Sequence, residues 1–165
     1  MDGNGLLEVN SAPNGSPGNL PSINFGSEAW VNYLFGFRFK VTQCNQIGLF
    51  SCMIVITFRN ESGEAYVLLI NTNNGEVSLE FGARGGWILF DHGITDTYLD
   101  LSKGTWHDVL FAADQEGISA AVDGTWTIAV SDDRLKTGAV GIMVGSGTTA
   151  QFDDFNAWNI PSDAP

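Results

Sequence analysis

The sequence predicts an all-β fold in which two antiparallel sheets pack face to face as a sandwich. Short segments with alternating apolar and polar residues, roughly eleven or twelve of them, recur about every ten residues. The composition combines 20 glycines and 12% aromatic residues with only 16% charged residues, which suits strands and tight turns. No apolar period of about 3.6 residues persists long enough to predict a helix beyond a single turn at residues 132–135.

The clearest predicted strand occupies residues 31–41. All of its odd positions carry Val, Tyr or Phe. Its even positions include Asn32, Arg38 and Lys40, so the strand is expected to have one buried and one polar face. The next predicted strand, about residues 50–58, is apolar on both faces. We therefore expect it to lie in the middle of a sheet.

Turn signals divide the rest of the chain into short strands. Asn73-Asn74-Gly75 contains an Asn-Gly step, which is typical of a tight hairpin, and it precedes a predicted strand at residues 76–81. Residues 82–103 interrupt the pattern with several glycines around one short strand. Regular spacing returns in the last third of the chain, in the segments Trp106–Phe111, Ile118–Gly124, Gly138–Ile142 and Phe152–Trp158.

Taken in this order, these four segments resemble the C-terminal half of a concanavalin A-like (laminin G-like) jelly-roll domain. The order of elements matches that family from about Glu28 to Trp158, although each motif is short. The resemblance implies jelly-roll connections between the sheets. It also implies a lectin-like, carbohydrate-binding function, because this family binds carbohydrate more often than it does anything else. The chemistry still has to be argued from specific residues.

Length and charge narrow the classes of protein. The 165 residues suit one domain, expected over residues 1–160, followed by a linker-like tail at 161–165. A net charge of −12 with only 7 basic residues argues against nucleic acid as a partner. No segment approaches the ~20 apolar residues of a membrane span, and no signal peptide is visible at the start. We expect a domain of a larger secreted or cell-surface protein.

The two cysteines, Cys44 and Cys52, flank a short turn-like segment. If residues 30–43 and 49–58 pair as a hairpin, the two side chains come close enough for a disulfide bond. Such a bond suits an oxidising compartment. Two free thiols are the alternative.

One strand offers a catalytic hypothesis, in the segment Glu76-Val77-Ser78-Leu79-Glu80. It resembles the Glu-x-Asp-x-Glu strand of laminarinase-like glycoside hydrolases, but Ser78 stands where that family has the central Asp. Retaining hydrolysis needs two carboxyl groups about 5–5.5 Å apart with different pKa values. The missing carboxylate favours a non-catalytic module. A hydrolase or lyase that uses Glu76 and Glu80 is the alternative.

Binding of a neutral glycan needs aromatic rings for stacking and planar polar groups for hydroxyls. We expect such residues on the concave sheet or its edge loops, with Trp87 after Gly85-Gly86 as the best exposed platform. Trp106 and Trp158 are expected in the core or at its edge. The predicted ligand-binding residues are Arg38, Arg59, Tyr66, Trp87, Tyr98 and Trp126, with Trp30 and Asn32 as further candidates on solvent faces.

A calcium site is implied by the resemblance, because many jelly-roll sugar-binding modules hold a structural Ca²⁺ between an N-terminal segment and an Asp of the last strand. Hard oxygen ligands of this kind suit Ca²⁺. The matching positions are Asp153 and Asp154, with Glu8 or Glu28 as the N-terminal partner. Surface carboxylates without a metal are the alternative. A structural or adhesive domain that contacts protein is a third function class.

Overall fold

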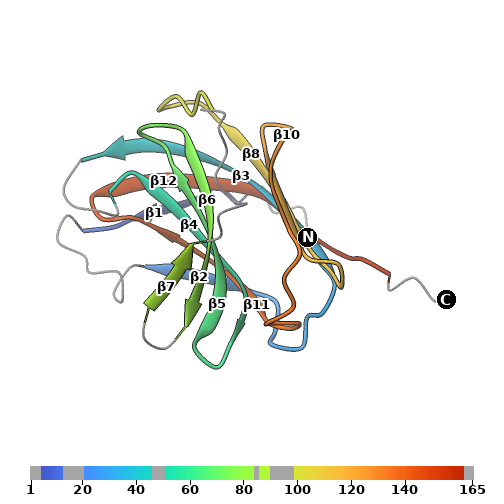
Figure 1. Cartoon of the computed structure of the whole chain (residues 1–165). Coiled ribbons are helices and arrows are strands. Elements are labelled where there is room, and N and C mark those ends of the chain that lie inside the picture. Colours follow the sequence, from blue (N-terminus) through green and yellow to red (C-terminus); the bar gives the residue numbers. More distant parts are fainter. Residues whose placement is uncertain (1–4, 13–20, 46–50, 84–85, 90–98, 162–165) are drawn as a thin grey trace.

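The computed structural model describes residues 5–12, 21–45, 51–83, 86–89 and 99–161, and for residues 83 and 86–89 it describes the backbone only. The described residues form twelve strands and no helix. The strands form two six-stranded antiparallel sheets that pack face to face, so the predicted β-sandwich is confirmed (Figure 1). No helix that could cross a membrane is found in this part of the chain.

Sheet A has the strand order β1-β12-β3-β8-β9-β10. Its strands are β1 (Leu7–Asn10), β12 (Thr148–Asn159), β3 (Tyr33–Cys44), β8 (His107–Ala113), β9 (Ile118–Val122) and β10 (Thr125–Val130). Sheet B has the order β2-β11-β4-β5-β6-β7. Its strands are β2 (Ser22–Phe25), β11 (Ala139–Val144), β4 (Met53–Glu61), β5 (Glu64–Asn71), β6 (Glu76–Ala83) and β7 (Gly86–Leu89).

The core lies between the two sheets. In β3 the odd residues point inward, as the alternation predicts, and Phe35 lies 5.6 Å from Phe111 of the neighbouring β8 between ring centroids. Phe111 in turn lies 5.1 Å from Phe58 of sheet B, so aromatic rings join the sheets directly. These rings are part of a large buried apolar core, whose burial is the main favourable contribution to folding.

Strand β4 is central in sheet B, between β11 and β5, as its two apolar faces predict. Ile54, Ile56 and Phe58 point into the main core. Val55 points to the opposite face, where it belongs to a second buried apolar cluster with Val67 and other residues of β5. Both faces of β4 are therefore buried, which explains why the strand is apolar on both faces.

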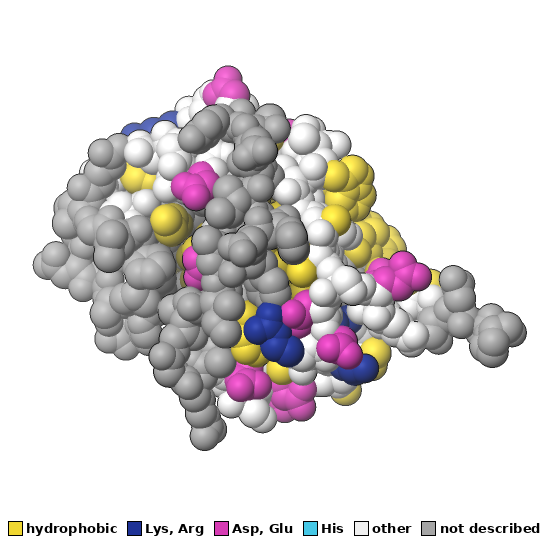
Figure 2. Space-filling model, viewed as in Figure 1, with side chains coloured by type: hydrophobic (Ala, Val, Ile, Leu, Met, Phe, Trp, Pro, Cys, Tyr) yellow, Lys and Arg dark blue, Asp and Glu magenta, His cyan; other side chains and the backbone are white. Residues whose placement is uncertain are grey.

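Some exposed hydrophobic side chains lie close together on one side of the view in Figure 2. Figure 2 shows them on the side of β10 and of the C-terminal end of β12. The large hydrophobic residues that the described part of the chain exposes are Leu6, Val31, Trp126 and Trp158. The two tryptophans belong to β10 and β12, and both strands are part of sheet A. An exposed cluster of this kind on a β-sandwich marks a surface to examine for binding.

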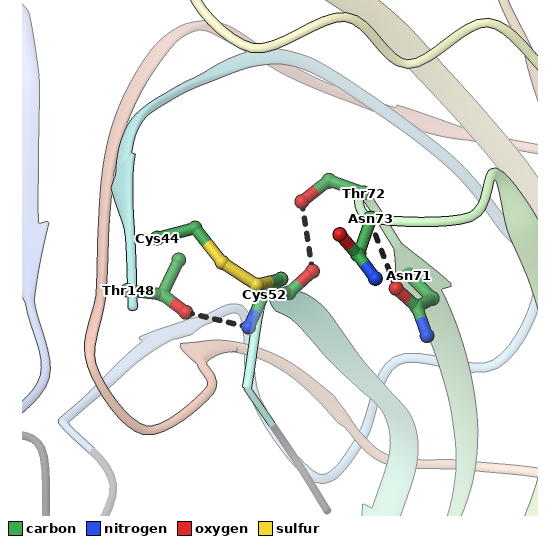
Figure 3. The surroundings of a disulfide bond; sticks show 6 residues. All are labelled: Cys44, Cys52, Asn71, Thr72, Asn73 and Thr148. Atoms are coloured by element: carbon green, nitrogen blue, oxygen red, sulfur yellow. Dashed lines mark hydrogen bonds between the residues drawn. A yellow bond between two sulfur atoms is a disulfide. The ribbon is translucent and has the colours of Figure 1, made fainter. Parts of the chain in front are cut away.

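The cysteines join the two sheets. Cys44 ends β3 of sheet A, Cys52 directly precedes β4 of sheet B, and a disulfide links them with Cα atoms 5.3 Å apart (Figure 3). The expected hairpin between these two segments is wrong. β3 pairs with β12 and β8, which occupy both of its edges, so the chain crosses to the other sheet after Cys44. The Cys52 N–H donates to Thr148 Oγ1 at 3.0 Å, which holds the crossing against β12.

Removal of this disulfide is expected to destabilise the sandwich. The bond closes a loop with a sequence separation of 8. A closed loop of this length lowers the entropy of the unfolded chain, which adds about 2.5 kcal/mol to the free energy of unfolding. Urea denaturation of the double variant Cys44→Ala, Cys52→Ala measures this loss. Wild-type protein in reductant should show the same loss, and equal stability of the reduced and oxidised proteins would contradict the prediction.

Candidate functional site

On the outer face of sheet A, a continuous row of residues crosses five strands. Cross-strand pairing places Trp126 opposite Ala121, Ala121 opposite Leu110, Leu110 opposite Gly36, and Gly36 opposite Asn156. Neighbouring strands lie about 4.8 Å apart, so the row is about 19 Å long. Its middle consists of small or aliphatic residues, and its ends consist of an indole ring and a carboxamide.

A groove of about 420 Å³ lies along this row. Trp126 stands at one side of the groove and is 61% exposed. Asp108, Asp154 and Asn156 supply polar groups to its lining. Gly36 keeps the floor low, because a Cβ atom at this position would lie 3.3 Å from Leu110 Cδ1 and 3.5 Å from Trp158.

A bulge in β12 determines which side chains face the groove. Asp153 pairs with Arg38 and Asn156 pairs with Gly36, so three steps along β12 match two steps along β3. Asp154 takes the extra position with a φ of 54°. Because side chains alternate along a strand, one extra residue exchanges the two faces for everything that follows.

This bulge explains the position of Trp158, which the sequence placed in the core or at its edge. Phe152 and Phe155 both reach the core, with ring centroids 6.0 Å from Phe37 in each case. After the exchange of faces, Trp158 lies opposite Leu34 on the outer face and is 48% exposed. Of the two positions expected for Trp158, the core or its edge, the core is therefore wrong. The inward spacing Phe152-x-x-Phe155 breaks the two-residue period, and it is the sequence signal that could have revealed the bulge.

A charged band borders the groove along the same face. Arg38 forms ion pairs with Asp153 at 3.3 Å and with Asp154 at 3.1 Å. Its guanidinium also lies 4.6 Å from the ring of Trp106, and Lys40 lies 4.8 Å from the same ring. Arg38 thus lies on the same face as Trp126, but its charge is already balanced by two carboxylates.

Three of the four residues expected to bind calcium contact other side chains in the structure. Asp153 and Asp154 pair with Arg38, while Glu8 accepts a hydrogen bond from Gln151 at 3.0 Å. Glu28 is exposed and belongs to a turn before β3. The described residues contain no group of three His, Cys, Asp or Glu side chains that could hold a metal. Ca²⁺ takes about six to eight oxygen ligands, so a site at these residues would also need backbone carbonyl and water oxygens, and the calcium site stays a prediction.

Arg59 and Tyr66 are buried, so their expected exposure to solvent is wrong. Arg59 is only 2% exposed and donates to the carbonyl oxygens of Leu135 at 2.7 Å and Asp114 at 2.5 Å. The ladder between β4 and β5 is irregular after Phe58, and Arg59 has a φ of 48°, which turns its side chain inward. Asn32, a further candidate, is also buried.

The Tyr66 hydroxyl belongs to a polar network at the same end of the sandwich. It donates to Asp132 and accepts from the Leu135 N–H at 3.3 Å. Burial, reinforced by the hydrogen bond to Asp132, raises the pKa of Tyr66 to about 12. Burial alone would raise the pKa of Asp132, but hydrogen bonds from Arg134 and Tyr66 outweigh it and lower that pKa. This network anchors residues 132–135 to the core.

The remaining candidates lie on sheet B or outside the described residues. The backbone of Trp87 belongs to β7, but its side chain is outside the described part, as is the whole of Tyr98. Glu76 and Glu80 lie on the outer face of sheet B, about 13 Å apart between Cα atoms. The Glu76 carboxylate accepts from Asn74 at 3.1 Å in the turn that precedes β6, away from Glu80.

Glu80 is half-buried, and this burial raises its pKa above the usual range of a glutamate. A carboxyl group with a raised folded-state pKa stabilises the fold at low pH, and this contribution is lost as the pH rises through the folded pKa. We therefore expect Glu80→Gln to raise the Tm at pH 7 and to have little effect below about pH 4.5. Thermal denaturation at several pH values measures this difference. Glu76→Gln removes one exposed charge from the same strand and is the matched control; an equal pH-dependent gain in both variants would contradict the prediction.

Comparison with known proteins identifies the fold. No family model matches the sequence, and no curated protein matches it. Among solved structures, a carbohydrate-binding module (CBM66) from Bacillus subtilis aligns with a TM-score of 0.63 and 14% identity over 94% of this chain and 96% of its own. Galectin LEC-6 from Caenorhabditis elegans aligns with a TM-score of 0.56 and 12% identity, over 90% and 95% of the two chains.

The receptor-binding domain of botulinum neurotoxin type G aligns with a TM-score of 0.57 and 14% identity, over 96% of this chain and 40% of its own. These similarities confirm the concanavalin A-like jelly-roll fold expected from the sequence. At such low identity they show the fold alone, because unrelated functions recur on one fold.

Proposed function

We propose that this chain is a non-catalytic carbohydrate-binding module that binds a polysaccharide on the outer face of sheet A. The observation that carries the proposal is the exposed indole of Trp126 beside a groove of about 420 Å³. An aromatic ring contacts the C–H face of a sugar, and a smooth floor of Gly36, Leu110 and Ala121 admits a flat ring. Asp108 and Asn156 are placed to bond hydroxyl groups.

Three further observations support this function. The row from Trp126 to Asn156 is long enough for an oligosaccharide, which favours a chain over a single sugar. Two of the similar structures are described as a carbohydrate-binding module and a galectin. The disulfide between Cys44 and Cys52 suits an oxidising, extracellular compartment, which agrees with a secreted or cell-surface protein.

Affinity gels that contain single polysaccharides, run beside a reducing-sugar assay with and without chelator, test this proposal. We expect one or more neutral polysaccharides to retard the protein without sugar release. Retardation that disappears with chelator would show that polysaccharide binding needs a divalent cation such as Ca²⁺. No retardation by any polysaccharide would overturn the proposal and favour an adhesive domain that contacts protein.

The hydrolase alternative depends on Glu80, whose raised pKa is a property that general acids share. Sugar release that is lost in Glu80→Gln and in Glu76→Gln would establish a hydrolase and overturn the binding-module proposal. The separate anchoring of Glu76 by Asn74 argues against a paired acid and nucleophile.

A further inference from the structure

Trp158 is a second exposed indole on the outer face of sheet A, in addition to Trp126. It follows Asn156 by two residues along β12, so both side chains point to the same face. A Cβ atom built on Gly36 would lie 3.5 Å from Cζ3 of the Trp158 indole. The Trp158 ring therefore reaches the groove floor at Gly36, near the end of the row that is farther from Trp126.

The surface between the two tryptophans is low. Its residues on β9, β8 and β3 form two neighbouring rows, one with Ala121, Leu110 and Gly36 and the other with Ala112 and Leu34. None of these side chains is larger than that of leucine. A ligand that lies flat on this surface can therefore contact both indoles at once, and a pair of exposed aromatic rings of this kind marks a binding surface.

The separation of the two indoles selects the length of the ligand. Trp126 belongs to β10 and Trp158 to β12, and the strands β9, β8 and β3 lie between them. Four steps between neighbouring strands, with an offset of two residues along β12, place the two Cα atoms about 20 Å apart. One pyranose unit of an extended polysaccharide advances by about 5 Å, which is close to the strand spacing of about 4.8 Å. A sugar chain that crosses the strands therefore needs about five units to contact both rings.

Both tryptophans lie at an edge of sheet A. The strand β10, which carries Trp126, is the last strand of the sheet. On the other side, β1 pairs with residues 149–152 of β12 and not with the described residues around Trp158. A hollow of about 340 Å³, which Trp158 also lines, leaves space beside this indole for further sugar units. A long chain can therefore pass over both indoles, which favours an internal stretch of a polysaccharide over its end.

We infer that the groove binds an internal stretch of about five sugar units of a neutral, linear polysaccharide, which crosses the strands of sheet A and contacts Trp126 at one end and Trp158 at the other. This inference rests on the proposed function and adds the second aromatic contact, the length of the ligand and its direction. The lining of the groove includes the carboxylates of Asp108 and Asp154, and none of its described residues is Lys or Arg. Neutral sugars are therefore favoured over uronic acids, whose carboxylates would be repelled.

Oligosaccharides of graded length test this inference. Cellulose, laminarin, xylan and mannan are screened in the affinity gels, and partial hydrolysis of the polysaccharide that retards the protein supplies chains of about two to about eight sugars, on both sides of the expected length. Isothermal titration calorimetry gives the Kd for each length. We expect the affinity to rise about thirtyfold or more between about two and about five sugars and then to level off. In Trp158→Ala the rise should stop at about three sugars, because the second ring contact is lost.

Val31→Ala is the matched control, because Val31 is 47% exposed and lies outside the groove, and it should keep the full dependence on length. Indole N–H signals in ¹H–¹⁵N NMR spectra provide a second measurement on the wild-type protein, assigned with single Trp→Phe variants. The Trp126 and Trp158 signals should shift together, with one Kd, when the hexasaccharide is added.

Three results would overturn the inference and leave the proposed function intact. They are a disaccharide that binds as tightly as the hexasaccharide, an unchanged dependence on length in Trp158→Ala, and a shift of the Trp126 signal without one of the Trp158 signal. Absence of retardation by every polysaccharide in the gels contradicts the proposed function itself, and the inference with it.

Discussion

Replacement of Arg59 with alanine is expected to lower the free energy of unfolding by about 3–5 kcal/mol. The guanidinium donates to the carbonyl oxygen of Leu135 in a buried hydrogen bond and to that of Asp114 in a partly buried one, and its removal takes both donors away. The large buried side chain would also leave a cavity. Urea denaturation followed by tryptophan fluorescence measures the loss.

Two further variants sharpen this experiment. Arg59→Lys keeps the charge but presents a single nitrogen, which cannot bridge both carbonyls, so we expect an intermediate loss. Lys136→Ala removes an exposed cation with a distant partner, 3.9 Å from Asp133, and should change stability by less than about 0.5 kcal/mol. A loss below about 1 kcal/mol in Arg59→Ala would show that desolvation of the buried cation cancels its hydrogen bonds.

Replacement of Trp126 with alanine is expected to weaken polysaccharide binding about thirtyfold, which corresponds to about 2 kcal/mol for a central aromatic contact. The side chain projects into solvent, so the Tm should stay within a few degrees of the wild type. Affinity electrophoresis at several polysaccharide concentrations gives the Kd. Leu6→Ala, which removes another exposed hydrophobic side chain (53% exposed) outside the groove, is the matched control.

A second variant separates loss of stacking from loss of shape. Gly36→Val places two methyl groups on the groove floor while Trp126 stays intact. We expect the affinity to fall about as much as in Trp126→Ala. The free energy of unfolding should fall by a smaller amount than the binding free energy, because the added Cβ lies 3.3 Å and 3.5 Å from its nearest neighbours. Full affinity in both Trp126→Ala and Gly36→Val would exclude this groove as the binding site.

Much of the fold could be predicted from local patterns. The alternation along β3 predicted its buried and exposed faces, and the doubly apolar β4 predicted a central strand. The Asn-Gly step predicted the β5–β6 hairpin, where Gly75 has a φ of 77°. Each of these signals acts over a few neighbouring residues, because side-chain alternation and turn conformation are properties of the local backbone.

The candidate site was predicted only in part. Trp126 and Arg38 lie on the outer face of sheet A as exposed or half-exposed residues, but Asn156, Asp108 and Gly36 were not identified. These residues come together only when β3, β8 and β12 pair in register. No short motif in the sequence encodes that pairing.

The sequence by itself determined which segments become strands and which of their side chains seek the core. The tertiary structure decided which strands pair, and therefore where the extra residues fall. A bulge next to Arg59 turned a predicted surface cation inward, and a bulge at Asp154 turned Trp158, expected in the core or at its edge, outward. A single extra residue reverses the facing of a strand, and its position depends on the partner strand, which lies far away in the sequence.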